Sequence, residues 1–385
     1  MRRRSFLAFG AATSAAAVLG TGTSATAAVR SATANTANTA NDPDSLRALA
    51  AKINLRIGTA LIPQDIETPT YAAIAGSQFS VVTPGNAMKW QIVEPTQGGF
   101  DWSQADQLVA FAQANKQLIR GHTLLWHNQL PDWLTTGVSN GSISNSQLFD
   151  LLHQHIITEV TRFRGKIWQW DVANEFFLDA NPSGINPNDF WVSHLGPGII
   201  PQAFRWAHEA DPHAILVYND YNIAGEDGSN AKSDAVFAWL KQMLAEGVPI
   251  HGVGNQGHLD TQFGFSPQRF QQDLERYASL GLKVAITEAD VRTFVNNATE
   301  QVPTDNLALF AQPYEFSQML KAALAVPECI SFTVWGFTDA DSWVPGFFTG
   351  EGYATIYDVN QQPKQAYFDM QQDLQLAAHG APHHG

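Results

Sequence analysis

Two glutamates follow apolar runs that are typical of buried strands. Glu175 ends the stretch "WQWDVANE", residues 168–175, and Glu288 lies in "KVAITEAD", residues 283–290. Two carboxyl groups that face each other can cleave a glycosidic bond, because one acts as nucleophile and the other first donates and then accepts a proton. Either glutamate taken alone fits a structural ion pair better. The interpretation therefore depends on a fold that brings the two together.

Aromatic and polar residues elsewhere in the chain fit a carbohydrate ligand. Tryptophan offers a flat apolar face on which a pyranose ring can stack, and asparagine, glutamine, histidine and lysine can hydrogen-bond to hydroxyl groups. The candidate tryptophans are Trp90, Trp126, Trp335 and Trp343. Each of them alone would be interpreted as a core residue, but together with the two glutamates they predict a sugar-binding cleft.

Eight short apolar runs alternate with amphipathic stretches from residue 43 onward, and no change in composition divides the chain. Helical patterns lie between the runs, for example at 103–116 and at 266–281, where Ser266 and Pro267 are typical of a helix start. Alternating strands and helices predict an α/β fold, here a single-domain (β/α)8 TIM barrel rather than a doubly wound sheet. The predicted strands begin at Arg56, Val81, Leu118, Ile167, Ala214, Gly252, Lys283 and Ile330.

The polar residues gather where such strands end, and the active site of a barrel of this kind lies at the carboxyl ends of its strands. In chain order they are His122, Trp126 and His127, then Asn174 and Glu175, Asn219 and Asp220, Gln256 and His258, and Glu288 and Asp290. We interpret Asp171, Asn219, Asp220 and Asp341 as supporting groups, because buried polar side chains at strand ends mostly satisfy one another.

Seven motifs occur in a characteristic order between Leu46 and Phe368. They are "GNAMKW" with "EPTQGGFDW", "GHTLLWH" with "LPDW", "WDVANE", "YNDYN", "GVGNQGHLD", "ITEAD" and "VWGFTDADSW". Together they resemble glycoside hydrolase family 10, the retaining endo-β-1,4-xylanases. The resemblance implies cleavage of β-1,4-xylosidic bonds in xylan by double displacement. We expect no metal or organic cofactor, because carboxyl groups fill both required roles.

The resemblance also implies a role for individual residues. Glu175 is the expected acid/base and Glu288 the expected nucleophile, about 5 to 5.5 Å apart as in retaining enzymes. An ionised Glu288 favours the protonated form of Glu175. Asn174 is expected to hold the sugar 2-hydroxyl, and Asp290 with His258 to tune Glu288. The residues expected to line the glycone subsites are Asn86, Lys89, His122, Trp126, Gln256, Trp335 and Trp343, and Asn174 and His258 are also expected to bind the substrate.

One position departs from the family pattern. The family usually has glutamate before the asparagine of "NAMKW", where this chain has Gly85. In the enzymes it resembles, that glutamate contacts the sugar at the −2 subsite. We therefore expect altered affinity for plain xylan, with a decorated xylan or another β-glycoside as the alternative substrate.

Three other functional classes match parts of the sequence. "GVGNQG", residues 252–257, fits the spacing of a dinucleotide-binding loop, but no helical pattern follows it. A metal hydrolase using His122, His127 and His258 lacks a recognised ligand spacing. A non-catalytic carbohydrate-binding barrel remains an alternative, although both glutamates are present.

The net charge and the two ends of the chain indicate its partners, its location and its domain boundaries. The formal net charge of −14 disfavours nucleic acid and anionic membranes as partners. Residues 1–27 have the pattern of a twin-arginine export signal, so we expect a secreted bacterial protein. We expect a disordered linker at 28–44, the catalytic domain at 45–372 and a disordered tail at 373–385, in a monomer. The single cysteine, Cys329, is predicted to lie in the core.

Overall fold

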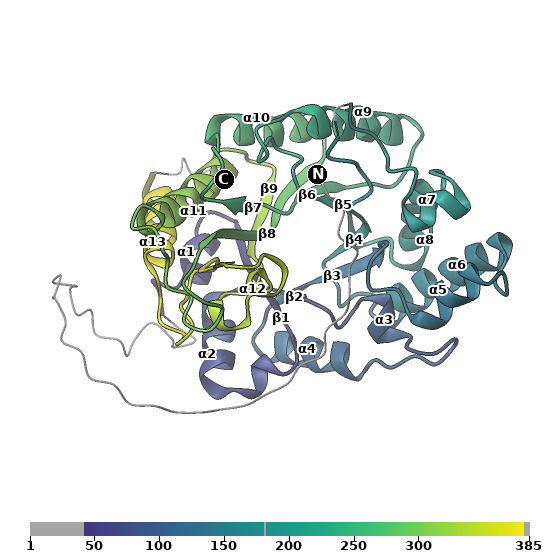
Figure 1. Cartoon of the computed structure of the whole chain (residues 1–385), viewed down its shortest axis with the longest axis horizontal. Coiled ribbons are helices and arrows are strands. Elements are labelled where there is room, and N and C mark those ends of the chain that lie inside the picture. The colour runs from purple at the N-terminus through teal and green to yellow at the C-terminus, as the bar shows by residue number, and fades with distance from the viewer. Residues whose placement is uncertain (1–41, 181, 381–385) are drawn as a thin grey trace. The chain divides into compact units, whose positions relative to one another are not determined.

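The computed structural model describes residues 42–180 and 182–380. In these ranges eight parallel strands close into a barrel, with helices around its outside (Figure 1). The predicted (β/α)8 TIM barrel is confirmed. The barrel strands are β1 (Arg56–Leu61), β2 (Val81–Pro84), β3 (Leu118–Leu125), β4 (Gln169–Asn174), β5 (Ile215–Asp220), β6 (Gly252–Asn255), β8 (Lys283–Phe294) and β9 (Cys329–Val334).

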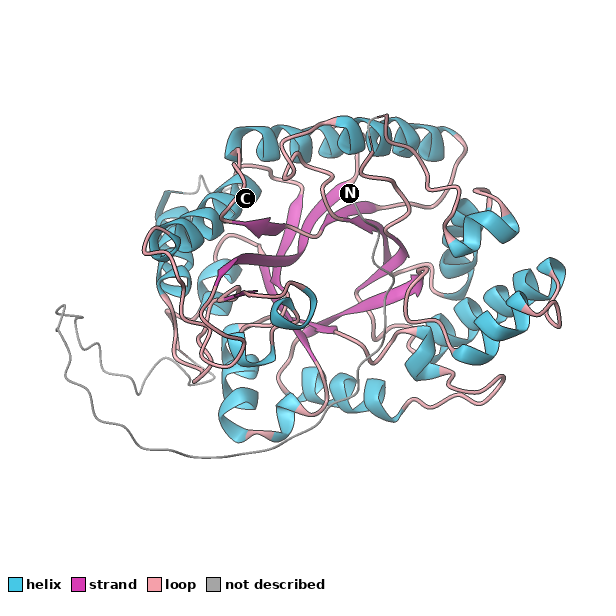
Figure 2. Cartoon of the chain, in the orientation of Figure 1, coloured by secondary structure: helices cyan, strands magenta, loops and turns pink. Residues whose placement is uncertain are grey.

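The barrel strands follow one another around the ring in chain order, and β9 closes the ring by pairing with β1, where Ile57 lies opposite Phe332. Figure 2 shows the closed ring of strands. Two short strands were not predicted. β7 (His258–Asp260) runs parallel to the end of β8, and β10 (Glu351–Gly352) pairs antiparallel with it. β8 is therefore longer than its barrel portion and carries its last residues beyond the rim.

Helices connect the strands and cover the barrel. Their apolar residues recur at helical spacing, as in α4, where Ala105, Leu108, Val109 and Ala112 are buried. The longer helices are α2 (Pro69–Gln78), α4 (Ser103–Ala114), α5 (Asp132–Ser139), α6 (Asn145–Arg162), α8 (Ile199–Ala210), α9 (Ala231–Ala245), α10 (Pro267–Ala278), α11 (Ala308–Leu324) and α13 (Gln365–Gly380). The shorter ones are α1 (Leu46–Ala51), η1 (Asp65–Glu67), α3 (Trp90–Val93), α7 (Phe190–Leu195), η2 (Asp339–Asp341) and α12 (Val344–Phe347).

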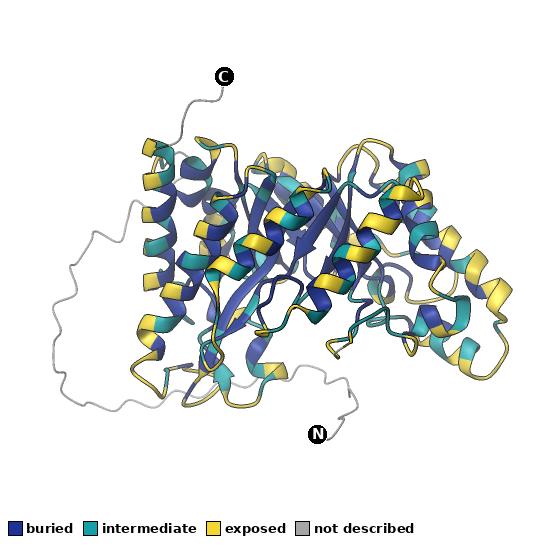
Figure 3. Cartoon of the chain, turned by 90° about the horizontal axis from the view of Figure 1, so that it is seen from above, coloured by how far each residue is buried: buried dark blue, intermediate teal, exposed yellow. Residues whose placement is uncertain are grey.

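Local sequence signals set where these helices begin. Ser266 caps α10 by accepting a hydrogen bond from the Arg269 amide, with Pro267 at the first helical position as predicted. Ser144 and Gln147 form a reciprocal capping box at the start of α6. Figure 3 shows the result, buried strands covered by helices whose outer faces are exposed. Cys329 is buried in β9, as predicted.

The two ends of the described domain pack together. α1 lies against α13, and the Gln371 side chain donates a hydrogen bond to the Asp44 carbonyl at 2.7 Å. α13 continues to Gly380, so the predicted start of a disordered tail at residue 373 was wrong for residues 373–380. The helix persists there because Leu374 is buried and Asp373 accepts a hydrogen bond from Ser317 of α11.

The predicted export signal, residues 1–27, and residues 28–41 of the predicted linker lie outside the described residues. Among the described helices, none combines the length and the apolar character needed to cross a bilayer.

Candidate active site

The structure brings most of the predicted site residues to the carboxyl ends of the barrel strands. His122 lies in β3, Asn174 ends β4 and Glu175 follows it, and Glu288 lies in β8. Gln256 follows β6, His258 begins β7, and Trp335 follows β9. The two glutamates therefore stand at the same rim of the barrel, on β4 and β8, as the strand order requires.

Glu288 is buried and surrounded by donors and positive charge. Its Oε1 accepts a hydrogen bond from Asn219 at 2.8 Å and lies 3.5 Å from the Arg120 guanidinium. Its Oε2 lies 3.5 Å from His258 Nε2. Burial raises the pKa of Glu288, but the neighbouring His258, together with the charges of His122 and Arg120, outweighs it and holds the pKa well below its usual range. Glu288 is thus a carboxylate at neutral pH.

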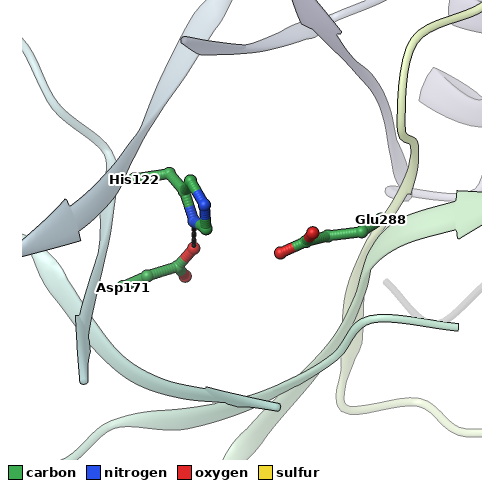
Figure 4. A group of neighbouring side chains, drawn as sticks. All are labelled: His122, Asp171 and Glu288. Atoms are coloured by element: carbon green, nitrogen blue, oxygen red, sulfur yellow. Dashed lines mark hydrogen bonds and ion pairs between the residues drawn. The ribbon is translucent and has the colours of Figure 1, made fainter. Parts of the chain in front are cut away.

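Arg120 is a site residue that the sequence reasoning missed. Its guanidinium pairs with both carboxylate oxygens of Asp171 and donates to the Thr287 carbonyl at 2.8 Å. His122 Nδ1 also contacts Asp171, at 2.8 Å, and Figure 4 shows this pair facing Glu288. A signal was present: an arginine inside the apolar run "LIRGHTLL" must be paired if the run is a buried strand.

Asn219, which the sequence predicts as a supporting group, connects the strands that carry the two glutamates. Its Nδ2 donates to Asn174 Oδ1 and to Glu288 Oε1, each at 2.8 Å. Thr287 fixes the amide orientation by donating to Asn219 Oδ1 at 2.7 Å. Gly254 makes room for this side chain, because a Cβ at that position would lie 2.4 Å from Asn219 Oδ1. The glycine of β6 therefore positions an amide on β5.

Glu175 lies in a different environment from Glu288. It is half-buried and accepts hydrogen bonds from Trp126 Nε1 at 2.9 Å and Gln256 Nε2 at 2.8 Å. Its backbone has φ of 61°, a left-handed conformation that a non-glycine residue rarely adopts and that costs about 1 kcal/mol or more. This turn directs the chain out of β4 at the point where the carboxyl group meets the site.

His258 lies between two carboxylates. Its Nδ1 is 3.0 Å from Asp290 Oδ2, and the same oxygen accepts a hydrogen bond from Trp343 Nε1 at 2.7 Å. Burial lowers the pKa of His258, but the charge and hydrogen bond of Asp290, together with Glu288, raise it to about 10. His258 is therefore a cation at neutral pH.

The remaining predicted residues lie on the β2, β3 and β9 side of the rim. Lys89 Nζ donates to Asn86 Oδ1 at 3.1 Å and lies 4.9 Å from the centre of the Trp126 ring. Burial lowers the pKa of Lys89 to about 8, although Glu288 and Glu175 oppose this effect. Trp335 is half-buried, with its ring centre 5.2 Å from that of His122. These side chains present cationic, amide and aromatic groups to one region.

Trp90 does not join this group, and its interpretation as a sugar platform was wrong. It is buried, stacked 3.8 Å from the ring of His155 and 5.5 Å from that of Trp191, and it donates to Glu94 at 2.8 Å. Its faces are therefore covered by protein. The segment 252–257 is no dinucleotide loop either, because strand β7 follows it where that loop would require a helix.

Among the described residues, one group of side chains is close enough together to bind a metal ion. Ligand atoms of His122, Asp171 and Glu288 lie within 4.8 Å of one another. The set does not suit a metal ion, because Arg120 already supplies positive charge to both carboxylates. The three histidines considered as metal ligands do not form one group. Each is paired with its own aspartate: His122 with Asp171, His127 with Asp189, and His258 with Asp290.

The comparisons with known proteins agree with one another on the family. The model of glycosyl hydrolase family 10 matches residues 45–373. Endo-1,4-β-xylanase B of Thermotoga neapolitana is 40% identical over 330 residues, which span 85% of this chain and 90% of that protein. An endo-1,4-β-xylanase of Agaricus bisporus is 37% identical, over 84% of this chain and 92% of its own. Xylanase 10B from Thermotoga petrophila RKU-1, solved with xylobiose, superposes with a TM-score of 0.80 at 37% identity, covering 87% of this chain and 98% of that one.

Proposed function

Because this chain belongs to glycosyl hydrolase family 10, we propose that it is an endo-1,4-β-xylanase that hydrolyses xylan with retention of configuration. One observation carries the mechanism: Glu175 and Glu288 stand at the same barrel rim, and their surroundings differ. Glu288 is buried among donors and cations that hold it ionised, whereas Glu175 contacts two neutral donors, Trp126 and Gln256. The setting of Glu288 suits a nucleophile, and Glu175, at the same rim, is left for the acid/base role that a retaining enzyme gives to its second carboxyl group.

The first half-reaction forms a covalent intermediate. A carboxylate oxygen of Glu288 attacks the anomeric carbon, and Glu175 gives its proton to the glycosidic oxygen, so the leaving sugar departs as an alcohol. Asn174 is placed to hold a substrate hydroxyl, because its Nδ2 is buried and has no hydrogen-bond partner among the described residues, while its Oδ1 is fixed by Asn219. A sugar hydroxyl in this position would satisfy that donor.

The second half-reaction releases the product. Glu175, now a carboxylate, takes a proton from water, and the resulting hydroxide attacks the anomeric carbon and frees Glu288. His258 and Arg120 stabilise the returning carboxylate of Glu288. Two inversions at one carbon give net retention. The glycone sugars are held by Asn86, Lys89, His122, Trp126, Trp335 and Gln256, together with Trp343, whose ring lies beside that of His258.

Two matched substitutions test the assignment. Glu175→Gln and Glu288→Gln should both lose turnover of xylan. On an aryl glycoside with a good leaving group, the Glu175 variant should still form the glycosyl-enzyme, because little proton donation is needed. The Glu288 variant should not. Azide should rescue Glu288→Ala with an inverted glycosyl azide as product, and full activity of Glu288→Ala without azide would end the nucleophile assignment.

Two finer points are also proposals. A Cβ at Gly85 would make ordinary van der Waals contacts, the nearest with Leu61 O at 3.5 Å and Ile62 Cγ2 at 3.6 Å. The position can therefore accept a side chain, and the absence of one supports a decorated xylan or another β-glycoside as the preferred substrate. Measuring kcat/KM of one purified sample on xylan, arabinoxylan, β-glucan and aryl glycosides would rank these alternative substrates. We also propose secretion by the twin-arginine route, which replacement of Arg3 and Arg4 by lysine should block in an export assay.

A further inference from the structure

A cavity of about 220 Å³ opens beside His258, next to the proposed nucleophile. It lies between the loop after β5, the strand β7 with the loop that follows it, and the end of β8. Phe263 and Phe265 give it apolar walls, and Asn222 adds an amide. Phe263 is 64% exposed although it is a large apolar side chain, so a ligand in the cavity would cover it. None of the roles assigned above uses these three residues.

Both cations of the cavity are already paired with carboxylates. The Arg292 guanidinium lies 3.0 Å from Asp260 and 2.7 Å from Glu351, and it also covers the ring of Phe348 at 4.0 Å. His258 lies between Asp290 and Glu288. Each cation therefore faces two acids. Among the lining residues, all of which are described, no positive charge is left over for an anionic ligand.

Two further acids complete the lining. Asp227 is exposed, and its carboxylate accepts only a local hydrogen bond from the Ser229 amide. Glu226 is buried and accepts a hydrogen bond from the Ala224 amide at 2.7 Å; burial raises its pKa to about 7. Even with Glu226 protonated, the acids that line the cavity or pair with its two cations outnumber those cations. A carboxylate entering the cavity would meet repulsion without a compensating ion pair.

We infer that this cavity receives a neutral sugar group of the substrate and discriminates against an acidic one. The inference rests on the proposed xylanase function, and it names the decoration that the site tolerates. An arabinosyl side group is uncharged, packs an apolar edge on Phe263 and Phe265, and offers hydroxyls to Asn222 and Glu226. A glucuronosyl side group has a similar ring but carries a carboxylate. Charge, rather than size, separates the two.

The test compares three xylooligosaccharides of equal backbone length: unsubstituted, arabinosyl-substituted and glucuronosyl-substituted, with every product identified. The wild type should turn over the arabinosyl substrate within a few-fold of the unsubstituted one and the glucuronosyl substrate roughly tenfold or more slowly in kcat/KM. Asp227→Asn should raise kcat/KM on the glucuronosyl substrate by roughly three- to tenfold, since it removes one nearby charge, and leave the other two unchanged. Glu246→Gln, which removes an exposed charge at the end of α9 away from the cavity, is the matched control and should change nothing.

A second variant tests the apolar wall. Phe263→Ala should lower kcat/KM on the arabinosyl substrate by several-fold and leave that on the unsubstituted one unchanged, because the exposed ring supports no other part of the fold. Equal rates of the wild type on both decorated substrates, or no response to Asp227→Asn, would overturn the inference and leave the xylanase proposal standing. Failure to cleave even the unsubstituted oligosaccharide would overturn both.

Discussion

Replacing Asp290 by asparagine would test how Glu288, the proposed nucleophile, is kept ionised. The substitution removes the negative charge that lies 3.0 Å from His258 Nδ1 and keeps the size of the side chain. The asparagine Oδ1 can still accept the hydrogen bond that Trp343 now donates at 2.7 Å. The change is therefore electrostatic, and we expect the fold to persist.

The size of the effect follows from the geometry. At an effective dielectric constant of about 20, two unit charges about 3 Å apart attract each other by roughly 5.5 kcal/mol, and 1.36 kcal/mol corresponds to one pKa unit. Loss of that attraction is enough to bring the pKa of His258 from about 10 to roughly 6. At pH 7 the ring would then be largely neutral. Glu288 would lose a cation at 3.5 Å, and its pKa would rise toward its ordinary range.

Three measurements follow. Histidine ring NMR should show His258 titrating near neutrality in Asp290→Asn and not below pH 9 in the wild type. The acidic limb of kcat/KM should move up by about one pH unit or more, because it reports the ionisation of the free nucleophile. His258 has a raised pKa in the folded protein, so its contribution to stability is complete below about pH 6.5 and is lost as the pH rises toward 10; this alkaline loss should disappear in the variant.

The matched control is Asp106→Asn, which breaks an exposed ion pair with Arg162 and should change none of these quantities. If His258 titrates unchanged in Asp290→Asn, or if the acidic limb does not move, Asp290 does not act on Glu288 through His258.

Three further outcomes are expected. Gly85→Glu should raise kcat/KM on linear xylotetraose by roughly tenfold, because a charge-assisted hydrogen bond contributes about 1.5 to 3 kcal/mol, and lower it on an arabinose-substituted analogue; unchanged constants on both would make Gly85 a neutral replacement. Dialysis against a chelator should leave activity intact, and a loss that zinc or manganese restores would contradict the two-carboxylate mechanism. Burial and the neighbouring Glu94 raise the pKa of Glu159 well above its usual range, so the folded state keeps that proton and loses stability as the pH rises above about 4.3. Glu159→Gln should remove this loss, and thermal unfolding at pH 5 and pH 8 should show a larger gain at pH 8; an equal effect at both would mean that Glu159 is ionised in the fold.

The sequence predicted the barrel because its eight apolar runs coincide closely with the barrel strands, and parallel strands place their carboxyl ends at one rim. It did not predict β7, β10 or the extension of β8 to Phe294. These segments pair with one another beyond the barrel, and their pattern does not differ from that of a loop. Hydrophobic periodicity identifies strands that bury one face in the core, whereas β7, β10 and the end of β8 lie beyond the edge of the core.

The limits of the site prediction have a similar cause. The sequence predicts a supporting role for Asp171 but not its main partner, Arg120, because Arg120 lies inside β3 and not at a strand end. Trp90 was assigned to the cleft because sequence cannot show that His155, on α6, stacks on its face. Contacts between elements far apart in the chain decide both cases, and no local pattern encodes them.

The contact between Gln371 and Asp44 holds the two ends of the domain close enough for a short linker to join them. From Gln371 to the end of α13 at Gly380 the helix advances by roughly 14 Å, a span that about five or six added residues can cross. A gene that joins the two ends there and opens the chain at the exposed turn of Asn140, Gly141 and Ser142 would keep every strand pair of the barrel. It would also place new termini in the connection between α5 and α6. A second domain could be fused there while the original ends stay joined by the linker.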